Sequence, residues 1–276
     1  MKVVKKGFTL IEVSLFLALT GFLMLGLVIG SNVSISRQRY NDTVNSFTEY
    51  LRGVYSDVLN VSNDKIPSSK PSGEDAGRTN KAVYGKLIIV GDPDTDIHTI
   101  YSYDVIGDAV NSSELTNSNI LESLQKLNAN VLSYADGKNT FFKESSFVLP
   151  WEGVLEDEEG EAKHGAILVV RSPSSGSIRT FSVWFAPTAP FPYLSFRNAL
   201  TNGENKTGIF NTLLMLMDTY QIAFCVDSPD NNYERRFEVL INENASNSSF
   251  IEKLALDSDN NECLDKKYSG NFPGES

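Results

Sequence analysis

A long uncharged stretch near the N-terminus constrains this chain more than any other feature. Between Val13 and Ser36 there is no Asp, Glu, Lys or Arg, and the stretch includes the run FLALTGFLMLGLVIG. About 20 apolar residues in a helix cross the hydrocarbon core of a bilayer, which is about 30 Å thick. The lysines of the opening MKVVKKG precede the stretch, and positive charge on that flank predicts a cytoplasmic N-terminus. The sequence therefore predicts a single-pass membrane protein that spans at about residues 10–30.

One carboxylate lies at the start of this stretch and helps to choose between interpretations of it. Glu12 is flanked by Leu10, Ile11 and Val13, and a charged side chain deep in a membrane helix costs about 2.5–3.5 kcal/mol on insertion scales. A secretory signal peptide has a shorter apolar run that ends at small residues, so it does not fit. An ordinary signal anchor fits the length and the lysines and stays an alternative, but it gives Glu12 no partner.

The residues around Glu12 resemble a known processing signal. The stretch KKGFTLIEVSLFLALTG is similar to the N-terminal signal of type IV pilins and type II secretion pseudopilins: a short basic leader, Gly, Phe and a Glu at the fifth mature position. The resemblance implies that a prepilin peptidase removes residues 1–7 by cutting between Gly7 and Phe8, and that Phe8 is then N-methylated. It also implies that Glu12 is an assembly residue that pairs with the Phe8 amine of a neighbouring subunit.

The helical pattern continues beyond the apolar stretch. Charged side chains such as Asp42, Glu49 and Arg52 lie between apolar residues that recur at alternating steps of four and three. This spacing predicts a helix with one apolar face. The apolar positions are Tyr40, Val44, Phe47, Leu51, Val54, Val58 and Val61. We therefore expect one helix over residues 8–61, whose first half, in the pilin resemblance, packs among subunits and whose second half packs under its own head. An anchor followed by a coiled-coil stalk would need more heptads.

Residues 62–276 are expected to form an extracytoplasmic globular head. Residues 62–81 are rich in Ser, Pro, Gly and charge and indicate a loop. Two helices are expected, at Ser113–Leu132 and Gly208–Tyr220. The β-type runs are Ala82–Val90, Thr99–Ile106, Thr140–Leu149, Ala166–Arg171, Ile178–Phe185, Gln221–Val226 and Arg235–Ile241. Strands in a row with an inserted helix predict an α+β head built on an antiparallel sheet.

The sequence contains two cysteines, Cys225 and Cys263. Both lie near the C-terminus, where many pilins have a disulfide-bounded loop, so the resemblance implies a disulfide between them. Loop entropy would make that bond worth about 3–4 kcal/mol. The alternative is that Cys225, in the apolar run IAFCV, is a buried free thiol.

Residue patterns typical of catalysis and metal binding do not occur. His98 and His164 have no Cys or His partner at metal-ligand spacing, and neither a G-x-S-x-G elbow nor a phosphate-binding glycine loop is found. The runs DPDTD from Asp92 and DSDNN from Asp257 alternate oxygen ligands, but both lack the glycine and the glutamate of an EF-hand. We expect no enzyme activity and no cofactor, with a calcium-binding loop as a minor alternative to solvated turns.

The expected function is a structural one. We predict a minor pilin of a type IV pilus, with other pilin subunits, the prepilin peptidase and an inner-membrane assembly platform as partners. The alternatives are a minor pseudopilin of a type II secretion system, a subunit of a competence-type DNA-uptake pilus, and a signal-anchored enzyme or binding domain. The formal net charge of −11 argues against direct nucleic-acid binding. The sequence leaves open which of these machines the chain serves.

Overall fold

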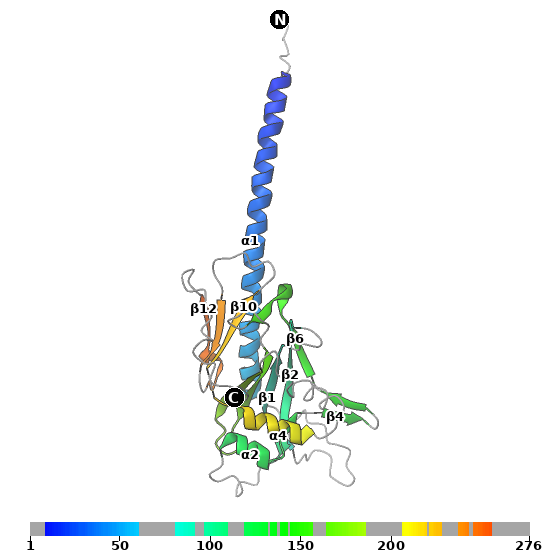
Figure 1. Cartoon of the computed structure of the whole chain (residues 1–276), viewed down its shortest axis with the longest axis vertical. Helices are drawn as coiled ribbons and strands as arrows, with labels where there is room; N and C mark the ends of the chain where they lie inside the picture. Colours follow the sequence, from blue (N-terminus) through cyan, green and yellow to red (C-terminus); the bar gives the residue numbers. More distant parts are fainter. Residues whose placement is uncertain are drawn as a thin grey trace, which may run out of the picture.

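The computed structural model describes a long helix and most of a head. In Figure 1 the helix runs from the N-terminal end of the molecule, and its second half lies among the strands of the head. The architecture is therefore α+β, as the sequence predicts. The described residues are 9–60, 81–91, 97–109, 119–131, 133–136, 139–142, 144–156, 164–185, 206–219, 221–227, 237–242 and 245–255.

The long helix, α1 (Leu10–Leu59), is continuous over its 50 residues. It begins after Thr9, whose backbone is extended, and it is followed by Asn60, whose backbone is no longer helical. The sequence predicts this helix over residues 8–61, and both of those end residues lie outside the described part of the chain. A single helix thus joins the apolar N-terminal stretch to the head.

The second half of α1 lies in the core of the head. Tyr55 is fully buried, and so is the stripe that the apolar spacing predicts. The members of that stripe are each at most 4% exposed: Tyr40, Val44, Phe47, Leu51, Val54 and Val58. Burying a large apolar side chain is worth about 1.5–3 kcal/mol, so this face holds the helix firmly in the head. The last predicted member, Val61, lies outside the described residues.

A larger antiparallel sheet packs against α1 around the central strand β1 (Lys81–Val90). Its strand order is β3-β2-β1-β8-β9, and β6 pairs with the same edge of β2 as β3 does. The bounds are Thr99–Asp108 for β2, Asn130–Val131 for β3, Glu144–Val148 for β6, His164–Arg171 for β8 and Ile178–Phe185 for β9. At a bulge in β1, a Cβ atom on Gly85 would lie 2.2 Å from the carbonyl oxygen of Val169, so only glycine fits there.

Both faces of this sheet are buried. Ile88 and Val90 belong to the core cluster around α1, whereas Leu87 and Ile89 belong to a second cluster on the opposite face. The helices α2 (Ile120–Lys126) and α4 (Lys206–Leu216) cover that opposite face with apolar side chains such as Leu124, Phe210 and Leu214. In Figure 1 the two helices lie together at the end of the head away from the N-terminus.

A second antiparallel sheet covers another side of α1. Its order is β12-β11-β10-β7, with bounds Ile251–Ala255, Phe237–Ile241, Ile222–Asp227 and Val154–Glu156 respectively. The ring of Phe47 meets that of Phe224 edge-on at 5.1 Å. The Tyr40 hydroxyl donates to the carbonyl oxygen of Val226 (2.9 Å) and accepts the N–H of Phe237 (2.7 Å). The second half of α1 thus contributes to a core shared with both sheets.

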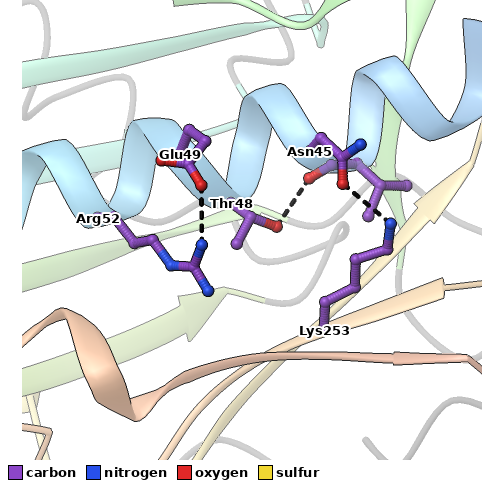
Figure 2. A network of polar contacts seen from close by, with 6 residues as sticks. Asn45, Thr48, Glu49, Arg52 and Lys253 are labelled. Carbon is purple, nitrogen blue, oxygen red and sulfur yellow. Dashed lines mark hydrogen bonds and ion pairs between the residues drawn. The ribbon is translucent and has the colours of Figure 1, made fainter.

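Figure 2 shows polar contacts of α1, two of them on its exposed side and one, from Thr48, buried. The ammonium group of Lys253, on β12, donates to Asn45 Oδ1 (3.0 Å), and Arg52 pairs with Glu49 (2.8 Å) within the helix. Lys253 also lies 4.1 Å from the centre of the Phe237 ring, and its partial burial lowers the pKa of this ammonium group. The contact to Asn45 therefore joins the edge strand of the second sheet directly to the helix.

Two predicted elements differ in extent from the structure. The helix expected over Ser113–Leu132 is shorter in the described residues: α2 begins after its N-cap Asn119 and ends at Lys126, and Asn128, with φ 47°, follows it. The strand expected over Thr140–Leu149 is wrong, because its residues belong to two strands in different sheets, β5 (Asn139–Phe142) and β6. β5 pairs with β4 (Ser133–Asp136) as a separate hairpin, whereas β6 joins the larger sheet.

Other differences concern the number of strands and sheets. The head has two larger sheets where one was expected, and β7 and β12 were not predicted. The helix expected at Gly208–Tyr220 ends earlier, at Leu216, because Asp218 forms a β-bridge with Ser182 instead. The predicted loop at residues 62–81 lies outside the described part of the chain except for Lys81, the first residue of β1.

Candidate membrane and assembly site

Among the described residues, nothing covers the apolar side chains of the first half of α1. From Leu10 to Ile29 the large apolar side chains are between 47% and 86% exposed. By length and composition this helix could cross a membrane. Such a surface is unfavourable in water, because removing one large apolar side chain from water is favourable by about 1.5–3 kcal/mol. We call this exposed apolar part, residues 10–29, the bare half of α1; its surface favours contact with lipid or with other protein.

Glu12 forms hydrogen bonds within its own chain. The backbone N–H and the hydroxyl of Thr9 both donate to Glu12 Oε2, at 2.9 and 3.0 Å. The N–H of Glu12 donates back to Thr9 Oγ1 at 3.3 Å, which completes a capping box at the start of α1. The spacing Thr9-x-x-Glu12 is the signature of a capping box in the sequence, a signal separate from the charge of Glu12. The capping box therefore explains the position of Glu12 without any role in assembly.

The other residues predicted for processing and assembly are only partly described. Gly7 and Phe8 lie outside the described residues, directly before Thr9. Cys225 is buried in β10 at 2% exposed and is disulfide-bonded. Cys263, the other cysteine in the sequence, lies outside the described residues, so the pairing of these two stays a prediction.

Both histidines make contacts to backbone carbonyl groups. His98 Nδ1 donates to the carbonyl oxygen of Gly153 (3.0 Å), and His164 Nδ1 donates to that of Gly91 (2.8 Å). The first contact joins the turn before β2 to the segment between η2 (Pro150–Glu152) and β7, and the second extends the pairing of β1 with β8 by one residue. The acidic runs that begin at Asp92 and Asp257 lie outside the described residues, and within the described ones no group of three or more His, Cys, Asp or Glu could hold a metal ion.

A short turn, η2 (Pro150–Glu152), packs on α1 where the helix enters the head. The hydroxyl of Thr43 donates to the carbonyl oxygen of Pro150 at 2.9 Å. A Cβ atom on Gly153 would lie 2.3 Å from Thr43 Cγ2, so glycine is needed for this close approach. One turn of helix earlier, the guanidinium carbon of Arg39 lies 4.7 Å from the centre of the Trp151 ring, which is a cation–π contact. Sequence analysis did not single out any of these residues.

The backbone of η2 is strained at two successive residues. Trp151 and Glu152 have φ of 57° and 54°, a left-handed conformation that costs residues other than glycine about 1–3 kcal/mol each. The segment is fixed on one side by Leu149, which is 2% exposed and whose N–H donates to the carbonyl oxygen of His98 (2.9 Å). Trp151 itself is 51% exposed. The fold thus holds a large aromatic side chain in solvent at an energetic cost, and such strain tends to occur at functional sites.

Comparisons with protein-family models, with curated proteins and with solved structures give no significant match. The resemblance to type IV pilins and pseudopilins therefore rests on the stretch from Lys5 to Gly21. The long two-part helix is consistent with that resemblance.

Proposed function

We propose that this chain is a structural subunit of a type IV pilus, a minor pilin that a prepilin peptidase processes between Gly7 and Phe8. The observation that carries the proposal is α1. One helix of 50 residues has a bare apolar first half and a second half buried in the head, and the processing motif lies directly before it. We assign the chain no catalytic role and no cofactor.

Assembly follows from the need to cover the bare half of α1. In the precursor, lipid covers it, with the N-terminus in the cytoplasm and the head outside. In a filament, the same surface packs against the bare halves of other subunits. Gly26 and Gly30 would help, because nothing lies within 4 Å of a Cβ atom at either position and small residues four apart let helices approach closely.

The charge of Glu12 has a second role in this proposal. Cleavage creates a new amine at Phe8, and a neighbouring subunit could present that amine to Glu12. Such a pair would remove the cost of a carboxylate at membrane depth and would set the axial register between helices. The capping bonds to Thr9 occupy Oε2, the oxygen that both Thr9 donors share. The second carboxylate oxygen, Oε1, would then accept the amine.

A minor pseudopilin of a type II secretion system is the nearest alternative, because it shares every N-terminal feature used here. A competence-type pilus subunit is a further alternative, in a scaffold role, since the net charge of −11 disfavours direct contact with DNA. A signal-anchored enzyme or binding domain differs from all three, because its anchor needs no processing.

Replacement of Gly7 separates these classes. We expect Gly7→Val to leave the precursor uncleaved when the chain is produced together with a prepilin peptidase, because the enzyme requires the small residue before the cut. The matched control is Gly21→Ala, in the same helix, where a Cβ atom meets nothing within 4 Å. A shift in electrophoretic mobility reports cleavage. Equal mobility of wild type, Gly7→Val and Gly21→Ala, all at the size of the precursor, would contradict the proposal and favour the anchored domain.

A further inference from the structure

We infer that Arg37, Arg39 and Trp151 form a membrane-docking rim, by which the head of the precursor rests on the zwitterionic phospholipid headgroups of the bilayer that α1 crosses. The inference rests on the membrane-spanning part of the proposed function, and it does not depend on cleavage or on filament assembly. Arg37 is exposed, Arg39 is partly exposed, and Trp151 is 51% exposed on its strained turn.

The helix rise places the rim near the outer surface of the membrane. If Glu12 lies at the inner boundary of the hydrocarbon core, a core of about 30 Å ends about 20 residues later, near Asn32. Arg37 lies about 7.5 Å beyond that point, and the headgroup layer itself is about 5–7 Å thick. A tilt of about 20° uses one or two more residues in the core and brings Arg37 and Arg39 still closer to the headgroups.

Side-chain direction moves the rim further toward the membrane. Side chains on a helix point back toward its N-terminus, so the guanidinium group of Arg39 lies over the preceding turn, on the side of Ile35. The Trp151 ring contacts that guanidinium group at 4.7 Å, so along the helix axis the ring lies within about one helical turn of it. Ile35, one turn nearer the membrane on the same face, is 46% exposed and adds apolar surface.

The chemistry of the rim fits a headgroup layer better than it fits water or the hydrocarbon core. Tryptophan is enriched at membrane interfaces because its ring is apolar and its indole N–H is polar. Arginine forms paired hydrogen bonds to phosphate, and its long side chain lets it reach the interface from a helix end. Glu152 is exposed beside Trp151 and brings a negative charge. A lipid that carries both phosphate and amine therefore matches the rim better than a purely anionic one.

The rim can be tested on the full-length chain in nanodiscs of phosphatidylethanolamine and phosphatidylcholine. The sequence has two tryptophans, Trp151 and Trp184, so fluorotryptophan labelling gives two fluorine NMR signals that Trp151→Phe assigns. Trp184 is partly buried and packs on Phe224 in the core of the head. A lipid with a paramagnetic label on its headgroup should broaden the Trp151 signal most and the Trp184 signal less.

Two variants make the test specific. Met215→Trp adds an exposed tryptophan on α4, at the end of the head away from the N-terminus, and its signal should stay sharp. The double variant Arg37→Gln, Arg39→Gln should reduce the broadening at Trp151 while the Trp184 signal keeps its position, which shows that the head remains folded. Trp151 broadening no greater than that of the α4 tryptophan would overturn the inference. So would a Trp151 signal that is unaffected in nanodiscs and shifts only in assembled filaments, because the partner would then be another subunit.

Discussion

Glu12 accepts hydrogen bonds from Thr9, and the proposed function gives its charge a second role in assembly; two substitutions separate the hydrogen bonds from the charge. Glu12→Gln keeps an oxygen that can accept from Thr9, since glutamine also completes a capping box, but it removes the charge. Glu12→Ala removes both. We expect both variants to be processed and inserted normally and to be depleted from sheared filaments, as measured by immunoblotting of the filament fraction. Incorporation of Glu12→Gln at wild-type levels would show that assembly does not use the charge.

Tyr55 links the stability of the head to pH. Its hydroxyl donates to Thr180 Oγ1 (2.5 Å), which donates in turn to the carbonyl oxygen of Ala245 (3.0 Å). Burial raises the pKa of Tyr55 from 10.0 to about 12. Between these two values the unfolded chain binds fewer protons than the folded one. The free energy of unfolding should therefore fall as the pH rises, by about 1.4 kcal/mol per pH unit for this residue.

Denaturant unfolding of the full chain in detergent micelles at several pH values from 9 to 11 measures this effect. Tyr55→Phe removes the titrating group and should make the decline above pH 10 shallower. It should also lower stability at neutral pH by about 0.5–1.5 kcal/mol, the net value of one hydrogen bond. Tyr50, whose pKa is also raised to about 12 by burial, should keep part of the decline in that variant. An unchanged slope would contradict the assignment to Tyr55.

At the scale of elements, the contact between η2 and α1 can be tested with a steric double mutant. Gly153→Ala should destabilise the head by about 1–3 kcal/mol, because the new Cβ atom meets Thr43 Cγ2. Thr43→Ser removes that methyl group but keeps the hydroxyl that bonds to Pro150. The pair should therefore be more stable than the sum of the single variants predicts, as thermal or denaturant unfolding would measure.

A matched glycine in α1 serves as the control for this cycle. Gly53 is exposed, and a Cβ atom there meets nothing within 4 Å. Gly53→Ala should stabilise the chain by about 0.5–1 kcal/mol, because alanine loses less backbone entropy in a helix. Additive effects of Gly153→Ala and Thr43→Ser would mean that the two elements do not press against each other.

Elements with a strong local pattern were predictable from the sequence, and elements that depend on distant partners were not. The apolar stripe of α1 follows from helical spacing alone, and β1, β8 and β10 are apolar runs bounded by polar residues. β7 and β12 are short and become strands only by pairing with β10 and β11. The need for glycine at position 153 depends on Thr43, which lies more than a hundred residues earlier in the chain. The capping box, in contrast, was visible in the sequence.

At the scale of the whole molecule, one helix joins two environments. The head encloses the second half of α1 with two sheets, and side chains of the helix and of both sheets share one core cluster. The rim at Trp151 lies at the boundary between the two halves, where the further inference places the contact of the head with the membrane. A rigid subunit of this form suits assembly, because the position of the head follows from the position of the helix.

The mature N-terminus is the most direct test of this account. The chain should be extracted from membranes of cells that contain a prepilin peptidase, and its N-terminal peptide identified by mass spectrometry. The account predicts a product that begins at Phe8 and carries an N-methyl group, without residues 1–7. A product that begins at Met1 in those cells would contradict it and would leave a head tethered by an ordinary signal anchor.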